Sequence, residues 1–226
     1  MKYIWSFESY EEEKEANNSI ALHLLSSTTL LCAYFIVSQY VYGFDLVTHP
    51  TQTLRILLIV EAPVVIGSHS WVRRNPKDCS LLKAAGRGLL SLPIGALLNA
   101  FGAIVLGAPI GIKYLARTAY WSLLMSLFTF VPAACVFGSS RIDWQHFVAC
   151  DKPTEITDYM IYFPAYGAVV GAWVGAWPMP LDWERPWQEW PICVTYGSVA
   201  GYLVGLLASS VCILLYVKRP THTKSD

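Results

Sequence analysis

The chain has 226 residues, of which 54% are hydrophobic and 14% are charged. A soluble globular domain carries roughly 25% charged residues, so this composition excludes an ordinary water-soluble domain and favours a protein that sits in lipid. The 16 basic and 16 acidic residues cancel, so no net charge attracts the chain to nucleic acid, and the charges matter through their placement.

Six stretches are long and apolar enough to cross a membrane. The hydrocarbon core is about 30 Å thick, and a helix that rises about 1.5 Å per residue needs about 20 residues to cross it. We therefore predict an all-α fold, a polytopic transmembrane helix bundle of about six spans. The predicted spans are residues 20–43, 51–72, 88–106, 114–138, 158–177 and 191–217.

The residues before the first span form an acidic segment. Its glutamates stand where a signal peptide carries basic residues, and the span is too long for the apolar core of a signal peptide. The first helix is therefore expected to be retained. We predict that residues 1–19 form an acidic cytosolic tail, that residues 20–217 form the bundle and that residues 218–226 form a C-terminal cytosolic tail.

Basic residues are distributed unevenly between the two sides of the predicted bundle. Lys and Arg concentrate in the short cytosolic loops of membrane proteins. With a cytosolic N-terminus, the opposite side holds only Lys113, Arg117 and Arg185 of the 16 basic residues, apart from one inside a span. Both termini are therefore predicted to be cytosolic, and the Asn17-Asn18-Ser19 glycosylation motif is expected to stay unmodified.

Two ionisable residues fall inside the second predicted span. Arg55 can extend its guanidinium to the membrane interface, whereas Glu61 lies deep. A charge at the centre of a membrane helix costs about 2.5–3.5 kcal/mol. Glu61 is therefore expected to be neutral or hydrogen-bonded, or else part of a proton path in a small transporter or lipid scramblase.

The cysteines and histidines form no recognisable metal motif. The six cysteines and five histidines are scattered, without the spacing that zinc ligands show. We expect the cysteines to fill small apolar spaces. The sequence predicts no catalytic residue, no cofactor and no metal site.

The last two predicted spans carry glycines at four-residue intervals. Rows of small residues allow two membrane helices to approach closely. In an antiparallel hairpin the two rows would meet in register, and they would serve either packing within the hairpin or a groove for a lipid or a partner helix. The rows are Gly167, Gly171 and Gly175 in one helix and Gly197, Gly201 and Gly205 in the other.

Tryptophan and proline are concentrated in residues 171–191, between the two glycine rows. Tryptophan favours the headgroup zone of a membrane, and proline stiffens a loop because it restricts φ. This density favours a stiff docking loop over a simple aromatic belt. The predicted partner- or lipid-binding residues are Trp173, Trp177, Pro178, Asp182, Trp183, Arg185, Pro186, Trp187 and Trp190.

The charges at the centre of this segment allow more than one role. Arg185 can bind a lipid phosphate or pair with a neighbouring carboxylate. Asp182 or Glu184 would be the acid of a transferase embedded in the membrane, although no nearby histidine or nucleophile completes such a site.

The same segment resembles a known family. Residues 171–192, centred on Pro-Leu-Asp-Trp-Glu-Arg-Pro-Trp-Gln, look like the signature of the PIG-F family of glycosylphosphatidylinositol (GPI) anchor biosynthesis. Gly107-Ala108-Pro109 and Phe128-Thr129-Phe130-Val131-Pro132 are similar to the middle of that family. The resemblance spans roughly residues 88–217.

The resemblance implies a multi-pass protein of the endoplasmic reticulum membrane that is not itself an enzyme. It implies a stabilising subunit for the large multi-pass transferases that add ethanolamine phosphate to mannose of the GPI precursor. In that family the partner carries the catalytic metal site in a lumenal domain, and phosphatidylethanolamine is the donor. The alternative remains a small membrane transporter or lipid scramblase that uses Glu61.

Overall fold

The computed structural model of the chain describes residues 2–40, 45–74, 76–77 and 79–218. These residues form helices and connecting loops, and no strand occurs among them. The elements are α1 (Lys2–Tyr40), α2 (Pro50–Trp71), α3 (Leu81–Val105), α4 (Ile112–Phe128), α5 (Phe130–Phe137), α6 (Arg141–Val148), α7 (Ile156–Ala176), the 3-10 turn η1 (Pro186–Gln188) and α8 (Ile192–Val217).

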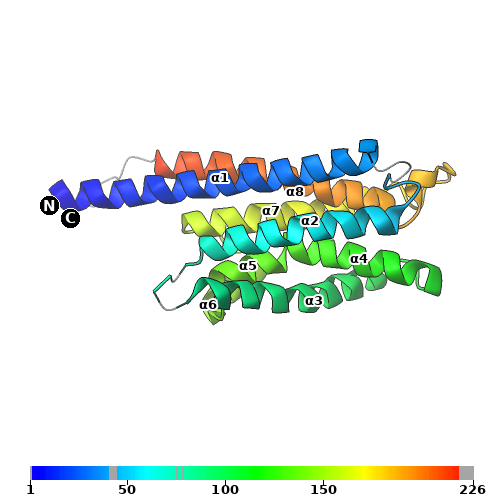
Figure 1. Cartoon of the computed structure of the whole chain (residues 1–226), viewed down its shortest axis with the longest axis horizontal. Coiled ribbons are helices and arrows are strands. Elements are labelled where there is room, and N and C mark those ends of the chain that lie inside the picture. Colours follow the sequence, from blue (N-terminus) through cyan, green and yellow to red (C-terminus); the bar gives the residue numbers. More distant parts are fainter. Residues whose placement is uncertain (1, 41–44, 75, 78, 219–226) are drawn as a thin grey trace.

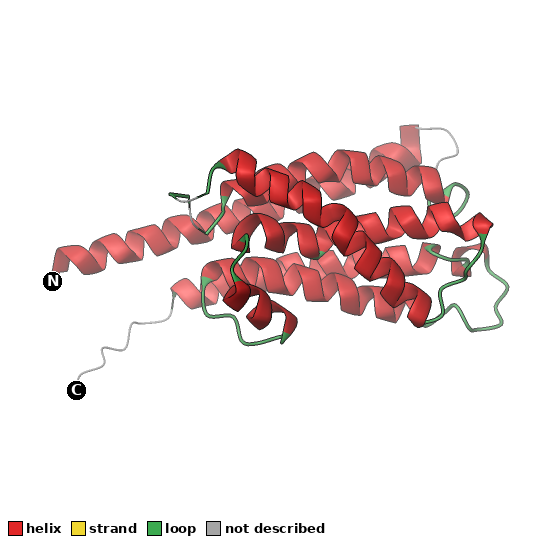
Figure 2. Cartoon of the chain, turned by 90° about the horizontal axis from the view of Figure 1, so that it is seen from below, coloured by secondary structure: helices red, strands yellow, loops and turns green. Residues whose placement is uncertain are grey.

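The long helices lie side by side and alternate in direction (Figure 1). The start of α1 and the end of α8 lie at one end of the bundle, together with α6 and the α2–α3 connection. The α7–α8 connection lies at the opposite end. Figure 2 shows the same elongated bundle from a direction at right angles, with loops gathered at its two ends.

Five helical segments of the described chain are long and apolar enough to cross a membrane. They are Tyr10–Ile36, Pro50–Trp71, Leu81–Val105, Ile112–Phe137 and Ile192–Val217. The predicted all-α fold is thus confirmed, with five helices that are long and apolar enough to cross a membrane. The difference from about six spans concerns α7, which is long enough but mixes Asp158, Pro164 and several tyrosines with its apolar residues.

The first helix is longer than the predicted first span. Residues 2–19, expected to form a tail, belong to α1. Glutamate, lysine and alanine are good helix formers, and a helix that continues into water satisfies its own backbone hydrogen bonds. The predicted end of the span, residues 41–43, and residues 219–226 of the predicted C-terminal tail lie outside the described residues.

The fourth predicted span is broken at Thr129, between α4 and α5. Pro132 has no N–H to donate, and its ring would clash with the carbonyl of Phe128, four residues earlier. The Thr129 hydroxyl and the Thr129 N–H both donate to the carbonyl oxygen of Met125, at 2.7 Å and 3.0 Å. We therefore attribute the break to the proline. Together, α4 and α5 still form one 26-residue segment, Ile112–Phe137, that is long enough to cross a membrane.

The α4–α5 pair forms the centre of the bundle. Of the 18 most apolar consecutive residues in the Ile112–Phe137 segment, 83% are buried, whereas only 22% are buried in the corresponding stretch of the Leu81–Val105 segment. Phe128 of α4 stacks on Tyr202 of α8, with ring centroids 4.2 Å apart. Helix α3, in contrast, points most of its large apolar side chains outward, as expected of a helix in contact with hydrocarbon.

Candidate partner and lipid interface

The hairpin of α7 and α8 is held together where the two glycine rows meet. A Cβ atom added to any of these glycines would collide with the backbone of the facing helix. The distances from such a Cβ to the facing Cα are 2.9 Å from Gly171 to Gly201, 3.0 Å from Gly175 to Gly197 and 3.2 Å from Gly167 to Gly205. The hairpin therefore depends on glycine at these positions and fixes where the connecting loop starts and ends.

The connecting segment, residues 177–191, is called the aromatic loop below. Gln188 is buried at its centre. Its Nε2 donates to the carbonyl oxygens of Pro178 at 2.6 Å and Leu181 at 2.7 Å. Its Oε1 accepts the N–H of Arg185 at 2.9 Å. The Gln188 side-chain amide therefore links the first half of the loop, at Pro178 and Leu181, to the second half, at Arg185.

Trp190 attaches the aromatic loop to α4. Its Nε1 donates to the Thr118 hydroxyl at 2.9 Å, and its ring meets that of Trp121 edge-on, with centroids 5.0 Å apart. Arg117 donates to the Trp190 carbonyl oxygen at 3.3 Å. Trp190 is buried, so the structure gives it an anchoring position inside the chain rather than one on the outer surface.

Glu189 adds an ionic attachment beside Trp190. Its Oε1 lies 2.8 Å from Nζ of Lys113 and 3.0 Å from the guanidinium of Arg117. The hydrogen bond from Lys113 is the main cause that holds the pKa of the Glu189 carboxyl below its ordinary value. A carboxyl with a lowered pKa stays charged at neutral pH, so these ion pairs are lost only in acid.

Three of the other predicted contact tryptophans face outward. Trp173, Trp177 and Trp183 are 61%, 73% and 55% exposed. Trp187 is half-buried and packs against Trp183, with ring centroids 5.9 Å apart. The remaining predicted contact residues are half-buried Pro178 and exposed Asp182, Arg185 and Pro186.

Arg185 and the two acids beside it are available to a ligand or partner. Within the described part of the chain, Arg185, Asp182 and Glu184 form no ion pair. The structure thus brings together an exposed aromatic surface and a free guanidinium, and it holds both in place through Gln188, Glu189 and Trp190. Gln188 and Glu189 are not among the predicted contact residues, yet two of the three basic residues predicted for this side, Lys113 and Arg117, bind Glu189.

A second polar site lies at the opposite end of the bundle, around Arg74. The Arg74 guanidinium pairs with Asp143 of α6 at 2.5 Å and with Asp158 of α7 at 2.7 Å. It also reaches Glu155 at 3.1 Å and donates to the Thr157 hydroxyl at 2.9 Å. Arg74 therefore joins the end of α2 to α6 and to the start of α7.

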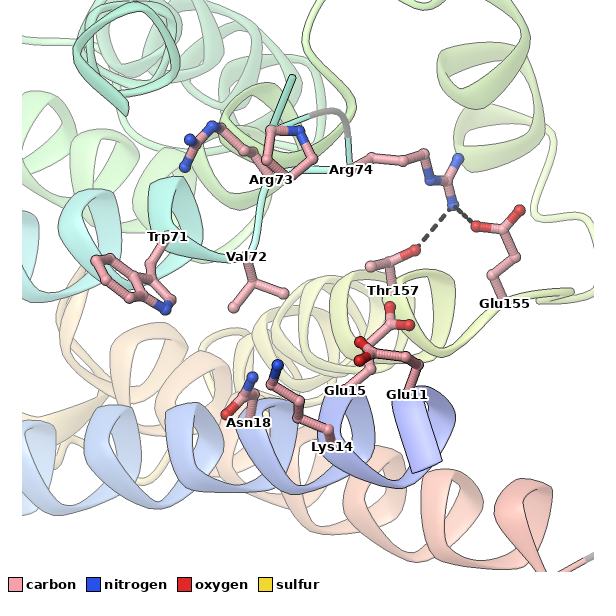
Figure 3. A pocket seen from close by; sticks show the side chains of 11 residues that line it. Glu11, Lys14, Glu15, Asn18, Trp71, Val72, Arg73, Arg74, Glu155 and Thr157 are labelled. Atoms are coloured by element: carbon pink, nitrogen blue, oxygen red, sulfur yellow. Dashed lines mark hydrogen bonds and ion pairs between the residues drawn. The ribbon is translucent and has the colours of Figure 1, made fainter. Parts of the chain in front are cut away.

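Figure 3 shows the pocket beside this ion-pair network. Glu11, Lys14, Glu15 and Asn18 project from α1 on one side, and Arg74, Glu155 and Thr157 lie on the other. Acidic and basic groups thus line the same pocket. Glu11 and Lys14 are exposed and Glu15 is half-buried, so this part of α1 lies beside the Arg74 network.

Glu61 is buried between helices, as expected from the sequence, and is 1% exposed. Neither carboxylate oxygen has a hydrogen-bond partner within the described residues. An unpaired charge in such surroundings would be costly, which agrees with the expected neutral carboxyl. The described residues also contain no group of His, Cys, Asp and Glu side chains that could hold a metal ion.

The fold and these sites define a polytopic helical membrane protein with an exposed aromatic loop at one end. The chain belongs to the GPI biosynthesis protein family Pig-F, which it matches over residues 15–210. The predicted family resemblance is confirmed, and the match also covers α2 and α1 from residue 15 onward, where the sequence motifs showed no resemblance.

Curated relatives are similar over most of the chain. A protein of Homo sapiens named "GPI ethanolamine phosphate transferase, stabilizing subunit" is 30% identical over 216 residues, which cover 93% of this chain and 98% of the relative. The Mus musculus protein of the same name is 31% identical, covering 86% and 94%. A Yarrowia lipolytica protein named "Glycosylphosphatidylinositol anchor biosynthesis protein 11" is 35% identical, covering 79% and 78%. No solved structure matches the chain.

Proposed function

We propose that this chain is the non-catalytic stabilising subunit of a GPI ethanolamine phosphate transferase. The observation that carries the proposal is family membership over residues 15–210, together with near full-length similarity to relatives that bear this name. The chain would act in GPI-anchor biosynthesis, which favours a location in the endoplasmic reticulum membrane.

The proposed topology has six spans and two cytosolic termini. With α7 counted as a span, its 21 residues reach about 31 Å, enough for the hydrocarbon core. The start of α1 and the end of α8 lie at the same end of the bundle, as an even number of crossings requires. The excess of basic residues at that end favours the cytosol. An N-linked glycan on Asn17 would contradict this orientation.

The aromatic loop is the proposed contact for the transferase and for lipid on the lumenal side. Its exposed tryptophans suit a partner surface or the headgroup zone, because indole combines an apolar face with a hydrogen-bond donor. Arg185 is the side chain that we assign to the phosphate of phosphatidylethanolamine. In this proposal the partner chain carries the catalytic site.

A small transporter or lipid scramblase remains the second candidate. The observation that favours it is Glu61, a fully buried carboxyl without a partner among the described residues. Intramembrane carboxyl groups often mark ion pathways. The two candidates differ in a property that can be measured, because a transporter acts alone and a stabilising subunit does not.

Co-purification separates these candidates. From cells that express the full chain with a tag, mild detergent should extract it with one large multi-pass protein in equal amount. The purified full chain alone, in liposomes, should move neither protons nor lipids. Recovery of the chain alone, together with transport that is lost in Glu61→Gln, would support the transporter and contradict the subunit.

A further inference from the structure

A basic pocket lies at the end of the bundle opposite the aromatic loop. It has a volume of about 340 Å³, within the range of pockets that bind small ligands. Arg73 follows α2, Lys83 and Arg87 belong to α3, and Ser139 and Ser140 form the turn between α5 and α6. These five residues define what is called the basic pocket below.

The positive charge of the basic pocket is not balanced by the described residues. No Asp or Glu lines the pocket in the described part of the chain, and no ion pair there involves Arg73, Lys83 or Arg87. Arg73 donates only to neutral carbonyl oxygens, at 2.5 Å to Cys79 and at 3.2 Å to Ser70.

Arg74, the next residue along the chain, shows how a basic side chain at this end is neutralised. Its guanidinium binds three carboxylates of α6 and the start of α7. The three cations of the basic pocket lack such partners among the described residues. Among the described residues, the pocket therefore brings together three cations that can bind an anion.

One of the three cations lies against the backbone of the turn after α5. Gly138 adopts a positive φ of 62°, and a Cβ atom added there would lie 3.1 Å from Cζ of Arg87. The guanidinium can lie against this turn only because glycine has no side chain. Helix α6 begins at Arg141, directly after Ser140, and its N-terminus adds partial positive charge beside the pocket.

The surroundings of the pocket indicate a lipid source for the anion. Lys83 and Arg87 share α3 with outward-facing leucines, of which Leu82 is 82% and Leu89 is 61% exposed. Basic residues beside lipid-facing leucines at a helix end lie at headgroup depth. Guanidinium and ammonium groups both bind phosphate, and arginine can do so through two parallel hydrogen bonds.

We propose that the basic pocket binds the phosphate group of an anionic phospholipid headgroup. The acyl chains would lie along the exposed apolar side of α3. This site is separate from the aromatic loop at the other end of the bundle and does not depend on the identity of the transferase partner. It would attach the chain to the leaflet on the side of its termini.

Lipid binding to the purified full chain tests the proposal. Native mass spectrometry would compare phosphatidylinositol, phosphatidylcholine and inorganic phosphate as probes. Phosphatidylinositol should bind to the full chain more tightly than phosphatidylcholine. Lys83→Gln and Arg87→Gln should each weaken its binding about tenfold, the effect of losing one charge-assisted contact. Arg87→Lys, which keeps the charge, should retain more binding than Arg87→Gln.

Arg141→Gln is the matched control, because Arg141 is exposed beside the pocket but does not line it. Its binding should equal that of the unchanged chain. Equal loss in Arg141→Gln and Arg87→Gln would overturn the proposal in favour of a diffuse basic surface. Equal binding of the two lipids would also overturn it, as would displacement of the lipid by equimolar inorganic phosphate. Circular dichroism checks the fold, and Lys83→Gln decides if Arg87→Gln does not fold.

Discussion

Gln188 and Arg185 are three residues apart in the aromatic loop, and their surroundings differ. Gln188 is buried and makes three hydrogen bonds to the backbone of the loop. Arg185 is exposed, and its guanidinium has no ion pair within the described residues. The Gln188 side chain therefore fixes the shape of the loop, whereas the Arg185 guanidinium is free to bind a ligand.

Substitution should separate these two roles. Gln188→Ala removes three hydrogen bonds from the loop, and each contributes about 0.5–1.5 kcal/mol. It should therefore lower both the amount of assembled transferase complex and its activity. Arg185→Ala should leave assembly nearly unchanged and lower ethanolamine phosphate transfer by the assembled complex, because the lost contact is with lipid phosphate.

Quantitative pull-down and a transfer assay on equal amounts of complex would measure both effects. Lys152→Ala, which removes an exposed positive charge between α6 and α7 at the opposite end of the bundle, serves as the control. If Arg185→Ala lowered assembly as much as activity, its role would be structural and the phosphate assignment would be wrong.

The sequence predicts the positions of some residues of the aromatic loop but not of others. The exposed tryptophans could be predicted, because indole density next to prolines is visible in the sequence. The role of Gln188 could not, since its partners are backbone atoms seven and ten residues away whose positions depend on the folded loop. The burial of Trp190 likewise depends on Thr118 and Trp121, which lie on another helix.

At the scale of elements, the α7–α8 hairpin sets the position of the aromatic loop. The two glycine rows bring the helix backbones into direct contact, so a larger side chain on either row must push the helices apart. The displacement would be transmitted to residues 177 and 191, where the loop joins the helices. We therefore expect the loop and the partner to respond to a change deep in the hairpin.

Gly171→Leu and Gly201→Leu test this coupling. Overpacking a close helix contact costs about 1–3 kcal/mol or more, so each variant should lower assembly with the partner several-fold. Val169→Leu and Val204→Leu are the matched controls, because these valines are 48% and 66% exposed. In a pull-down, the control variants should recover nearly the same amount of partner as the unchanged chain. Unchanged assembly in both glycine variants would show that the hairpin does not organise the loop.

The elements were predictable where one physical rule dominates. The spacing of the glycines predicts the register of the hairpin from helix periodicity alone, and apolar length predicts the long helices. The break at Thr129 was not predicted, because the stretch around it is uniformly apolar and only the effect of Pro132 on the backbone interrupts it. That residues 2–19 are helical could not be predicted from apolar length, because a helix in water keeps its backbone hydrogen bonds without apolar residues.

At the scale of the whole molecule, the two ends of the bundle have different chemistry. One end carries the aromatic loop with Arg185, and the other carries the basic pocket and the Arg74 network. The exposed tryptophans and Arg185 of the aromatic loop suit contact with the transferase partner. The basic residues at the other end suit the anionic surface of the cytosolic leaflet. The central claim is that the chain acts by keeping a large transferase intact.

The lifetime of that transferase tests the claim most directly. In cells from which the full chain is removed, pulse-chase labelling of the tagged transferase should show degradation several-fold faster than in control cells, and restoring the chain should return the original half-life. A transferase that keeps its half-life and abundance in cells without the chain would contradict the account.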